Sequence, residues 1–162
     1  MEKLITERLE LRRFTQTDEG GFVEILTDPE VYKFLGDGQG ATPEFAKKIL
    51  VNYIFNRGIF AVVEKTANTL VGYCGVRPIQ DGRIELLYGY GPAAWGKGFG
   101  TEAAKAVLQY AKDELLMKNI IAIAYPENLG SIGVIKKLNF THCGTEEHFG
   151  KMLELFSLSL ND

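Results

Sequence analysis

The sequence predicts an α/β protein in which a mixed, mostly antiparallel central sheet of about seven strands carries helices on both faces. Apolar segments with the period of a strand alternate with segments of helical period, in the order β-α-α-β-β-β-α-β-α-β-β. Within this order, residues 84–116 form a strand, a glycine-rich loop and a long helix. The chain of 162 residues is 46% hydrophobic and 24% charged, which indicates a single domain, residues 1–162, with a sizeable core.

The first part of the chain is predicted to contain one strand and two helices. Leu9 and Leu11 alternate with charged residues, the pattern of a half-buried strand. Asp18 is a candidate cap for a helix that ends before the Asp-Pro pair at 28–29, because the residue before proline disfavours helical backbone angles. The Thr-Pro-Glu sequence at 42–44 is a helix start, with a cap, a proline at the first position and an acid in the first turn.

The second part is organised around the segment that contains the glycine-rich loop. The strand before the loop is rich in apolar and aromatic side chains, and the helix after it repeats apolar residues at the spacing of one buried face. The predicted strands are residues 59–64, 70–76, 84–90, 119–124, 140–144 and 152–158, and the helix near the end of the chain is predicted at 131–138.

The glycine-rich loop at residues 95–100, Trp-Gly-Lys-Gly-Phe-Gly, predicts a site for phosphate. Thr101 is a candidate cap for the helix that follows, and Glu102 suits the positive first turn. A helix N-terminus presents N–H groups without intrahelical partners, and glycines let the backbone approach a ligand closely. Lys97 would add a full positive charge. The alternative interpretation is a tight turn that needs its glycines for geometry alone.

Two common phosphate motifs do not fit this loop. The loop of nucleoside triphosphatases needs Ser or Thr after its lysine to hold magnesium, and here Gly98 follows Lys97. The dinucleotide fingerprint needs the spacing G-x-G-x-x-G and an acidic residue at the end of the next strand. Here the spacing is G-x-G-x-G and the next strand ends in Ala-Tyr at 124–125. Both nucleotide interpretations therefore fail on specific residues.

Three motifs occur in order along the chain. Residues 6–12 are TERLELR, Glu85-x-x-Tyr88 is followed by WGKGFGTEA at 95–103, and residues 128–140 are NLGSIGVIKKLNF. Together they resemble the GNAT superfamily of N-acetyltransferases, and in particular the branch of the RimJ and RimL ribosomal-protein N-terminal acetyltransferases. The middle motif is similar to the acetyl-CoA loop of that family, although a tryptophan begins the loop where Arg or Gln is usual. The resemblance spans essentially the whole chain.

The resemblance implies that acetyl-CoA, a cosubstrate, lies where the sheet splays between the strand before the glycine loop and the strand after the long helix. It implies direct transfer of the acetyl group to a primary amine, either a peptide N-terminus or a small molecule. Peptide groups at 88–90 would bind the pantetheine arm as an added strand, and core packing is the alternative role of the aromatic side chains. Lys137 would meet a CoA phosphate, or would lie at a helix C-terminus where cations are favoured. The residues implied to bind the cofactor are Tyr88, Gly89, Tyr90, Trp95, Gly96, Lys97, Gly98, Phe99, Gly100, Thr101, Asn128, Ser131 and Lys137.

Acetyl transfer needs a base for the amine and a donor for the thioester oxygen, which becomes negative in the reaction. Glu85, on the strand before the loop, is the candidate general base. The alternative role for Glu85 is a structural ion pair with Arg83 or Arg77. A backbone N–H near Tyr90, freed by a strand irregularity, is the candidate oxyanion donor.

The departing CoA thiolate benefits from an acid. Many relatives place a tyrosine for this purpose in the second helix of the cofactor site, at the position that Ile135 holds here. In the branch that the chain resembles, the serine of the N-x-x-S motif is proposed for the role, so Ser131 is the candidate acid. Capping the helix is its alternative role. A CoA-binding module without catalysis is the alternative function.

Composition excludes other classes of protein. A net charge of −3 gives no footprint for nucleic acid, no apolar segment is as long as a membrane span, and the charged start lacks the core of a signal peptide. The absence of an export signal, together with only two cysteines, Cys74 and Cys143, indicates a cytoplasmic protein. Cys74 is expected to be buried, and no Cys or His pair has zinc-ligand spacing, so no metal is expected. The resemblance also allows a homodimer, since relatives are often dimers.

Overall fold

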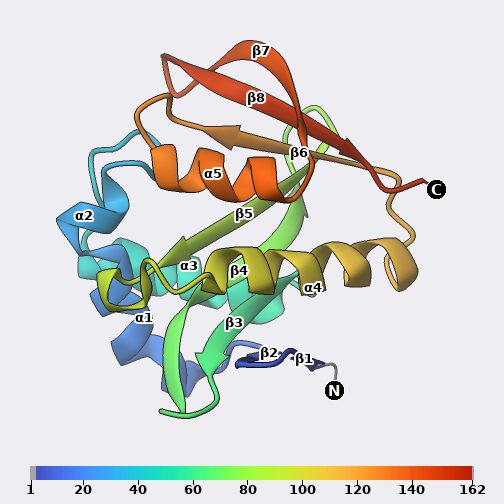
Figure 1. The fold of residues 1–162 in the computed structure, drawn as a ribbon. Coiled ribbons are helices and arrows are strands. Elements are labelled where there is room, and N and C mark those ends of the chain that lie inside the picture. The colour runs from blue at the N-terminus through green and yellow to red at the C-terminus, as the bar shows by residue number, and fades with distance from the viewer. Residues whose placement is uncertain (1–2, 162) are drawn as a thin grey trace.

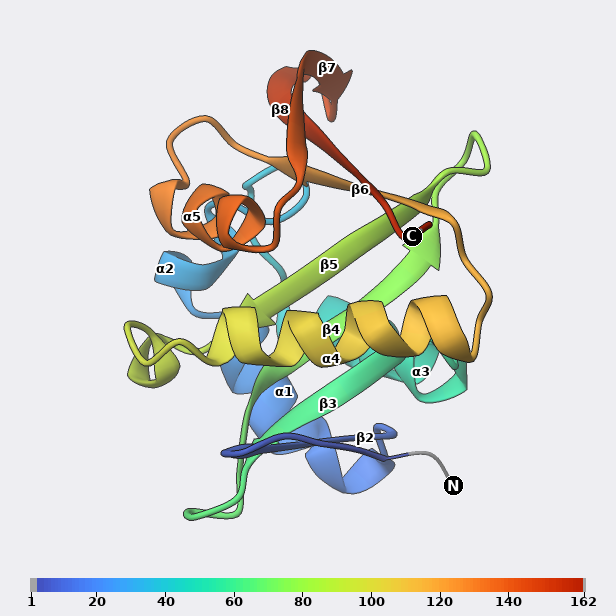
Figure 2. The ribbon, with the colours of Figure 1, turned by 45° about the vertical axis from the view of Figure 1, so that its right-hand side comes forward.

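The computed structural model describes residues 3–161 as a central sheet with helices on both faces (Figure 1, Figure 2). Its elements are β1 (Leu4–Ile5), β2 (Leu9–Arg12), η1 (Gln16–Asp18), α1 (Glu19–Leu26), α2 (Pro29–Tyr32), α3 (Pro43–Phe55), β3 (Ile59–Glu64), β4 (Thr69–Pro78), β5 (Ile84–Tyr90), η2 (Pro92–Ala94), α4 (Phe99–Asp113), β6 (Asn119–Ala124), α5 (Leu129–Lys137), β7 (Thr141–His148) and β8 (Lys151–Ser159). The eight strands lie in the order β1-β2-β3-β4-β5-β6-β8-β7. The predicted class and layering are confirmed. The strand beyond the predicted seven is β1, whose two residues are too few to show an alternating pattern.

Helices α4 and α5 cover one face of the sheet, and α1 and α3 cover the other (Figure 2). The core under α4 and α5 includes Leu86 of β5, with Tyr88 packed against it. The core under α1 and α3 includes the aromatic residues Phe22 and Tyr53, with Leu87 of β5 packed against it. Because side chains alternate along a strand, β5 presents different residues to the two layers.

The sheet is antiparallel at every described pair of strands except β5 and β6. These two parallel strands pair at a single point, where Glu85 lies opposite Ile121. Figure 2 shows them close together there and then separating in a V toward the glycine loop and the start of α5. The splay that the resemblance implies is therefore present at the predicted strands.

Two helix starts differ from the predictions. Helix α4 begins at Phe99 rather than after Thr101, because Gly98 occupies the cap position with φ of 80°. Thr101 therefore lies inside the first turn. Helix α5 begins at Leu129, and the side chain of Asn128 caps it by accepting from the Ser131 amide at 3.2 Å. In both cases the capping residue lies three residues before the predicted one. The predicted start of α3 is confirmed.

Asp18 lies just before α1, as predicted, but its carboxylate does not cap that helix. Its two oxygens accept hydrogen bonds from the Arg12 guanidinium at 2.8 and 2.9 Å, and Oδ2 accepts another from the Thr15 amide at 2.9 Å. Burial alone would raise the pKa of Asp18, but these hydrogen bonds outweigh it and hold the pKa below its ordinary value. The ionised carboxylate therefore stabilises the junction of β2 and α1.

We expect Asp18→Asn to lower the free energy of unfolding by about 2 kcal/mol at neutral pH, since it weakens charge-assisted hydrogen bonds at a buried site. The carboxyl has the lower pKa in the folded state, so its stabilisation is present above the unfolded-state pKa of about 4 and is lost as the pH falls below it. Denaturant unfolding at neutral and acidic pH measures the effect. The difference between wild type and variant should narrow in acid, and a constant difference would contradict this assignment.

Candidate active site

The gap between β5 and β6 exposes one side of the β5 backbone. The Gly91 amide donates to the Val71 carbonyl at 3.0 Å. The backbone groups of Gly91, and of every second residue before it along β5, therefore face β4. Backbone groups alternate along an antiparallel strand, and the N–H groups of Tyr88 and Tyr90 therefore face the gap. The Tyr90 carbonyl shares this direction and accepts from Trp95 Nε1 at 2.9 Å. A ligand that carries amides can bind here as an added strand.

The strand irregularity expected near Tyr90 is absent. Strands β4 and β5 stay in register from Ile84 to Tyr90 without a bulge. The amides face open space because β6 departs after Glu85, not because β5 is distorted. A backbone N–H near Tyr90 is thus exposed to the gap as expected, but the departure of β6 exposes it, not a strand irregularity.

The glycine loop brings main-chain donors to the mouth of the gap. Gly96 and Gly98 adopt φ of 74° and 80°, a region that side chains disfavour. The first hydrogen bond along α4 runs from the Glu102 amide to the Gly98 carbonyl at 3.1 Å, so the N–H groups at 99–101 have no carbonyl partner within the helix. Gly100 lies close to α5, since a Cβ there would approach Val134 at 3.4 Å. These donors suit an anion.

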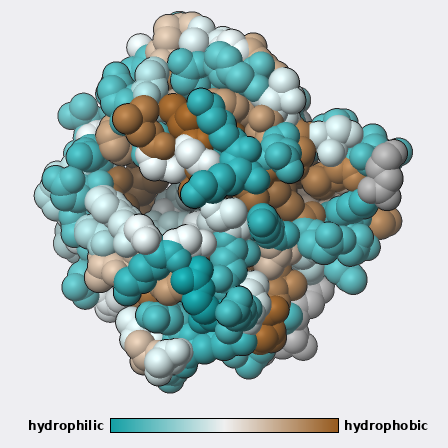
Figure 3. Space-filling view, in the orientation of Figure 1, coloured by the Kyte–Doolittle hydropathy of each residue, from teal (hydrophilic) through white to brown (hydrophobic). Residues whose placement is uncertain are grey.

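The surface is hollowed between α5 and the glycine loop, on the side where β5 and β6 separate (Figure 3). Residues of low or intermediate polarity line this hollow in the view shown. A separate pocket of about 510 Å³ opens on the outer side of the loop and includes Thr6. The loop therefore has open space on both of its sides.

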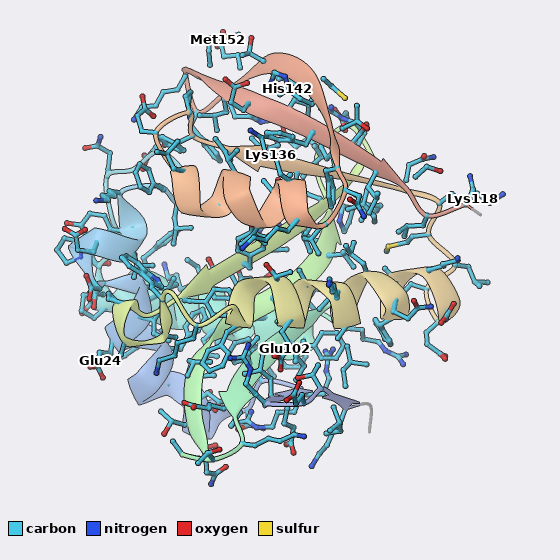
Figure 4. The ribbon with its side chains drawn as sticks, viewed as in Figure 1. Glu24, Glu102, Lys118, Lys136, His142 and Met152 are labelled. Atoms are coloured by element: carbon cyan, nitrogen blue, oxygen red, sulfur yellow. The ribbon has the colours of Figure 1, made fainter. Side chains whose placement is uncertain are left out.

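Arg8 holds the loop from outside, a role for which the sequence carries no local signal. Its Nε donates to Glu102 Oε1 at 2.8 Å, its Nη1 donates to the Lys97 carbonyl at 2.6 Å, and its guanidinium lies 4.7 Å from the centre of the Phe99 ring. Glu102 also accepts from the Thr6 hydroxyl at 2.6 Å. Figure 4 shows Glu102 projecting from the first turn of α4 toward the N-terminal strands. One cation thus ties β2, the loop and α4 together.

We expect Arg8→Ala to raise both the Kd and the KM for acetyl-CoA by about three- to tenfold with little change in kcat, because the loop loses hydrogen bonds that order it before binding. Isothermal titration and initial rates measure the two constants. Lys3→Ala is the control, since it removes an exposed ion pair with Glu10 on the same N-terminal strands. An unchanged Kd in Arg8→Ala would show that the loop is ordered without Arg8.

Ser131 and Tyr88 meet at the α5 side of the gap. The Tyr88 hydroxyl lies 2.8 Å from Ser131 Oγ and 3.2 Å from the Ser131 carbonyl oxygen. Asn128 caps α5, so Ser131 is not needed as a cap and its hydroxyl is directed to Tyr88. Ile135, one turn further along, is buried and 1% exposed. The two hydroxyl groups near the start of α5 therefore come from Tyr88 on β5 and Ser131 on α5, and Ile135 supplies none.

Glu85 lies on the opposite face of β5, toward α1 and α3. Its side chain is 16% exposed, and its carboxylate is 3.4 Å from an Arg77 guanidinium nitrogen. Of the two alternative partners, Arg77 is the one that contacts it, because Arg83 pairs with Asp81 and Glu146. The long separation and the 41% exposure of the Arg77 side chain make this ion pair weak.

Two buried tyrosines, Tyr53 and Tyr73, lie near Glu85 on this face. Tyr73 packs over Gly89, where a Cβ would stand 2.7 Å from its ring, and its ring centre lies 5.4 Å from that of Tyr53. Burial raises the pKa of Tyr53 to about 12 and raises the pKa of Tyr73 as well. Both phenols are therefore neutral at physiological pH.

Of the other residues predicted to bind the cofactor, some lie at the glycine loop and one does not. Trp95 is 48% exposed, so core packing does not apply to it. Lys97 is an exposed loop residue whose Nζ lies 5.8 Å from the centre of the Phe99 ring. Lys137 is the last residue of α5, at the end of that helix away from the loop, and it lines a groove of about 440 Å³ with Lys105 and Lys112. The structure does not bring Lys137 to the glycine loop.

Cys74 is buried, as predicted, and burial raises the pKa of its thiol to about 12, which makes it a poor nucleophile. Among residues 3–161, no three His, Cys, Asp or Glu side chains gather as a metal site. The same residues contain no helix with both the length and the hydropathy that a membrane span requires.

The sheet splits at a parallel pair of strands, with a glycine loop and a helix N-terminus at the mouth of the split, which is the arrangement that the resemblance to acetyl-CoA-dependent acetyltransferases implies. A family model for the acetyltransferase (GNAT) domain matches residues 8–141. The chain belongs to this family, and it is an N-acetyltransferase that uses acetyl-CoA. Family membership supports an enzyme over the alternative of a non-catalytic CoA-binding module.

The similar proteins cover the whole length of the chain. An uncharacterized N-acetyltransferase of Bacillus licheniformis, p20, is 30% identical over 171 residues, covering 99% of this chain and 96% of that protein. A GNAT-family acetyltransferase structure from Bacillus anthracis matches with a TM-score of 0.84 and 24% identity over 98% of both chains. RimL, described as a ribosomal L7/L12 alpha-N-protein acetyltransferase in complex with coenzyme A, matches with a TM-score of 0.80 and 15% identity over 98% of both chains. The two structures show the same fold.

Proposed function

We propose that this N-acetyltransferase moves the acetyl group directly from acetyl-CoA to a primary amine, with Glu85 as general base and Ser131 as the acid that faces the leaving sulfur. One observation carries the proposal. The two side chains lie on opposite sides of β5, Glu85 on the side of α1 and α3, at the point from which β5 and β6 separate, and Ser131 on the side of α5. A thioester in the gap would therefore have a carboxylate on one side and a hydroxyl on the other.

Each step then has a group of this chain beside it. Glu85 accepts a proton from the attacking amine, whose nitrogen forms a bond to the thioester carbon. The Tyr90 N–H, which faces the gap, donates to the oxygen as it becomes negative, and the Tyr88 N–H is left for the pantetheine arm. Ser131 donates to the sulfur as the carbon–sulfur bond breaks. The proton held by Glu85 is finally lost to water.

The proposed cofactor site follows the same geometry. The peptide groups at 88–90 bind the pantetheine arm, and the loop at 95–101 with the first turn of α4 binds the diphosphate. Asn128 lies at the start of α5, beside the gap, and its side chain oxygen is already used in capping. Its amide nitrogen remains the group for a pantetheine contact. Lys137 is too far along α5 to serve the diphosphate and would serve only a more distant phosphate.

The acceptor side is proposed to lie around residues 36–40. The Gly36 carbonyl accepts from the Tyr125 hydroxyl at 2.6 Å, and the Asp37 carbonyl accepts from Lys151 Nζ at 3.0 Å. This loop is therefore held against the end of β6 and the β7–β8 hairpin. The resemblance to the RimJ and RimL branch favours a peptide N-terminus as the acceptor over a small amine.

A panel of short peptides with free N-termini and of small amines tests the proposal. We expect acetyl-CoA consumption, followed by release of the CoA thiol, to depend on the amine, with acetylated product confirmed by mass spectrometry. N-terminally blocked copies of the same peptides are the control. Acetyl-CoA binding without transfer to any member of the panel would contradict the proposed acceptor class.

A further inference from the structure

The Tyr88 phenol occupies an unusual position for a core tyrosine. Its ring packs against the core under α4 and α5, and its hydroxyl reaches Ser131 in the first turn of α5. Burial raises the pKa of Tyr88, and the hydrogen bond with Ser131 offsets only part of this effect. The phenol therefore keeps its proton and acts as a hydrogen-bond donor.

The phenolic hydrogen has two acceptors within reach, Ser131 Oγ at 2.8 Å and the Ser131 carbonyl oxygen at 3.2 Å. When Tyr88 donates to the carbonyl, the Ser131 hydroxyl is free to donate to Tyr88. When Tyr88 donates to Oγ, the Ser131 hydrogen is released to point elsewhere. A negative charge in the gap favours the second arrangement, because it attracts the released hydrogen.

We propose that Tyr88 is a positioning residue for the leaving group, whose hydroxyl donates to Ser131 Oγ and so turns the Ser131 hydrogen toward the CoA sulfur. This inference rests on the proposed role of Ser131 at the leaving sulfur and narrows it, because Ser131 assists the sulfur by donating a hydrogen bond and does not transfer its proton. Neither hydroxyl gives up its proton, and the pair stabilises the sulfur as a thiolate through a charge-assisted hydrogen bond. The carbon–sulfur bond breaks with its electron pair on sulfur, and the amine proton leaves through Glu85.

Ionisation of CoA bound to the enzyme tests this inference without any acceptor amine. The ultraviolet absorbance of the thiolate is followed against pH in wild type, Tyr88→Phe, Ser131→Ala and the double variant. We expect Tyr88→Phe to lower the acid dissociation constant of the bound thiol by about tenfold, since the donor to the thiolate is weakened. The double variant should match Ser131→Ala alone, because Tyr88 acts through Ser131.

Two controls separate this role from packing. Tyr110→Phe makes the same chemical change in the same core cluster, on α4, and should leave the ionisation of the bound thiol unchanged. Ser131→Thr keeps a hydroxyl and should retain the effect of Tyr88→Phe. A purely structural role would change the affinity for CoA while leaving the ionisation of its thiol as in wild type.

Kinetics with an accepted amine give the second measurement. We expect Tyr88→Phe to lower kcat by about tenfold with an unchanged KM for acetyl-CoA. The inference is overturned if the bound thiol ionises in Tyr88→Phe as it does in wild type, or if the effects of Tyr88→Phe and Ser131→Ala add in the double variant. Neither result would contradict the proposed acetylation of an amine. If Ser131→Ala changes neither measurement, the proposed acid fails and the inference fails with it.

Discussion

Replacing Glu85 with glutamine is expected to lower kcat by about 10²- to 10⁴-fold, the usual contribution of a positioned general base. Glutamine has the shape of glutamate but cannot accept a proton, either from the acceptor ammonium before attack or from the amine nitrogen as it attacks. The side chain is 16% exposed and pairs only loosely with Arg77, so the fold should tolerate the change. Steady-state rates with the best amine of the panel, and titration of acetyl-CoA into the variant, measure the effect.

The pH dependence distinguishes a base from an ion-pair partner. The loss in Glu85→Gln should shrink as the pH rises, because a larger fraction of the amine is then deprotonated in solution and needs no base. Arg77→Gln is the matched control, since it breaks the same ion pair and leaves the carboxylate. If the pair is structural, both variants should lose similar stability and neither should lose kcat. A Glu85→Gln enzyme that binds acetyl-CoA and acetylates at the wild-type rate would exclude Glu85 as the base.

The fold was predictable where an apolar segment is bounded by residues that commonly end a strand or helix. The bounds of β3, β5 and β6 match the predictions, because each is a short apolar run that ends at charged, glycine or asparagine residues. The V between β5 and β6 was expected from the resemblance. It has no local signal in the sequence, because β5 and β6 are separated along the chain by α4 and pair only at Glu85.

The site was predictable in its main-chain parts and less so in its side chains. The glycine spacing indicates a loop with exposed amides, and Gly96 and Gly98 have the positive φ that this requires. Arg8 and Tyr88 were missed in their roles because their partners lie far along the chain. Arg8 contacts Glu102 across 94 residues, and Tyr88 contacts Ser131 across 43. Periodicity and capping rules describe neighbours within a few residues and carry no information on such pairs.

The helix starts show the limit of capping rules at a binding loop. Thr101 has the side chain that capping statistics favour, yet Gly98 is the cap of α4. A glycine there leaves the first-turn amides without a competing side-chain acceptor. The local rule fails at the point where the loop is shaped for a ligand, and such conflicts are expected at functional sites.

Gly98→Val is the second change for which we expect a large effect, a rise of about 100-fold in the Kd for acetyl-CoA. Gly98 adopts φ of 80°, which a β-branched residue disfavours strongly, and its Cβ would lie 3.3 Å from Arg8 Nη2. Relief of this strain moves the loop, so the amides that follow no longer converge on a diphosphate. Strain of about 1–3 kcal/mol converts to a loss of about ten- to a hundredfold in affinity, and the displaced Arg8 adds to it.

Gly82→Val provides the matched control for Gly98→Val. Gly82, in the turn between β4 and β5, has φ of 90° and nothing within 4 Å of a Cβ, so it carries the same backbone penalty away from the loop. Both variants should lose comparable stability in thermal unfolding, while Gly98→Val alone loses affinity for acetyl-CoA in calorimetry. Free CoA should weaken in parallel with acetyl-CoA, because the two share the diphosphate. If Gly98→Val binds both as wild type does, the main-chain amides ahead of α4 do not hold the diphosphate, and the proposed orientation of the thioester toward Glu85 fails with them.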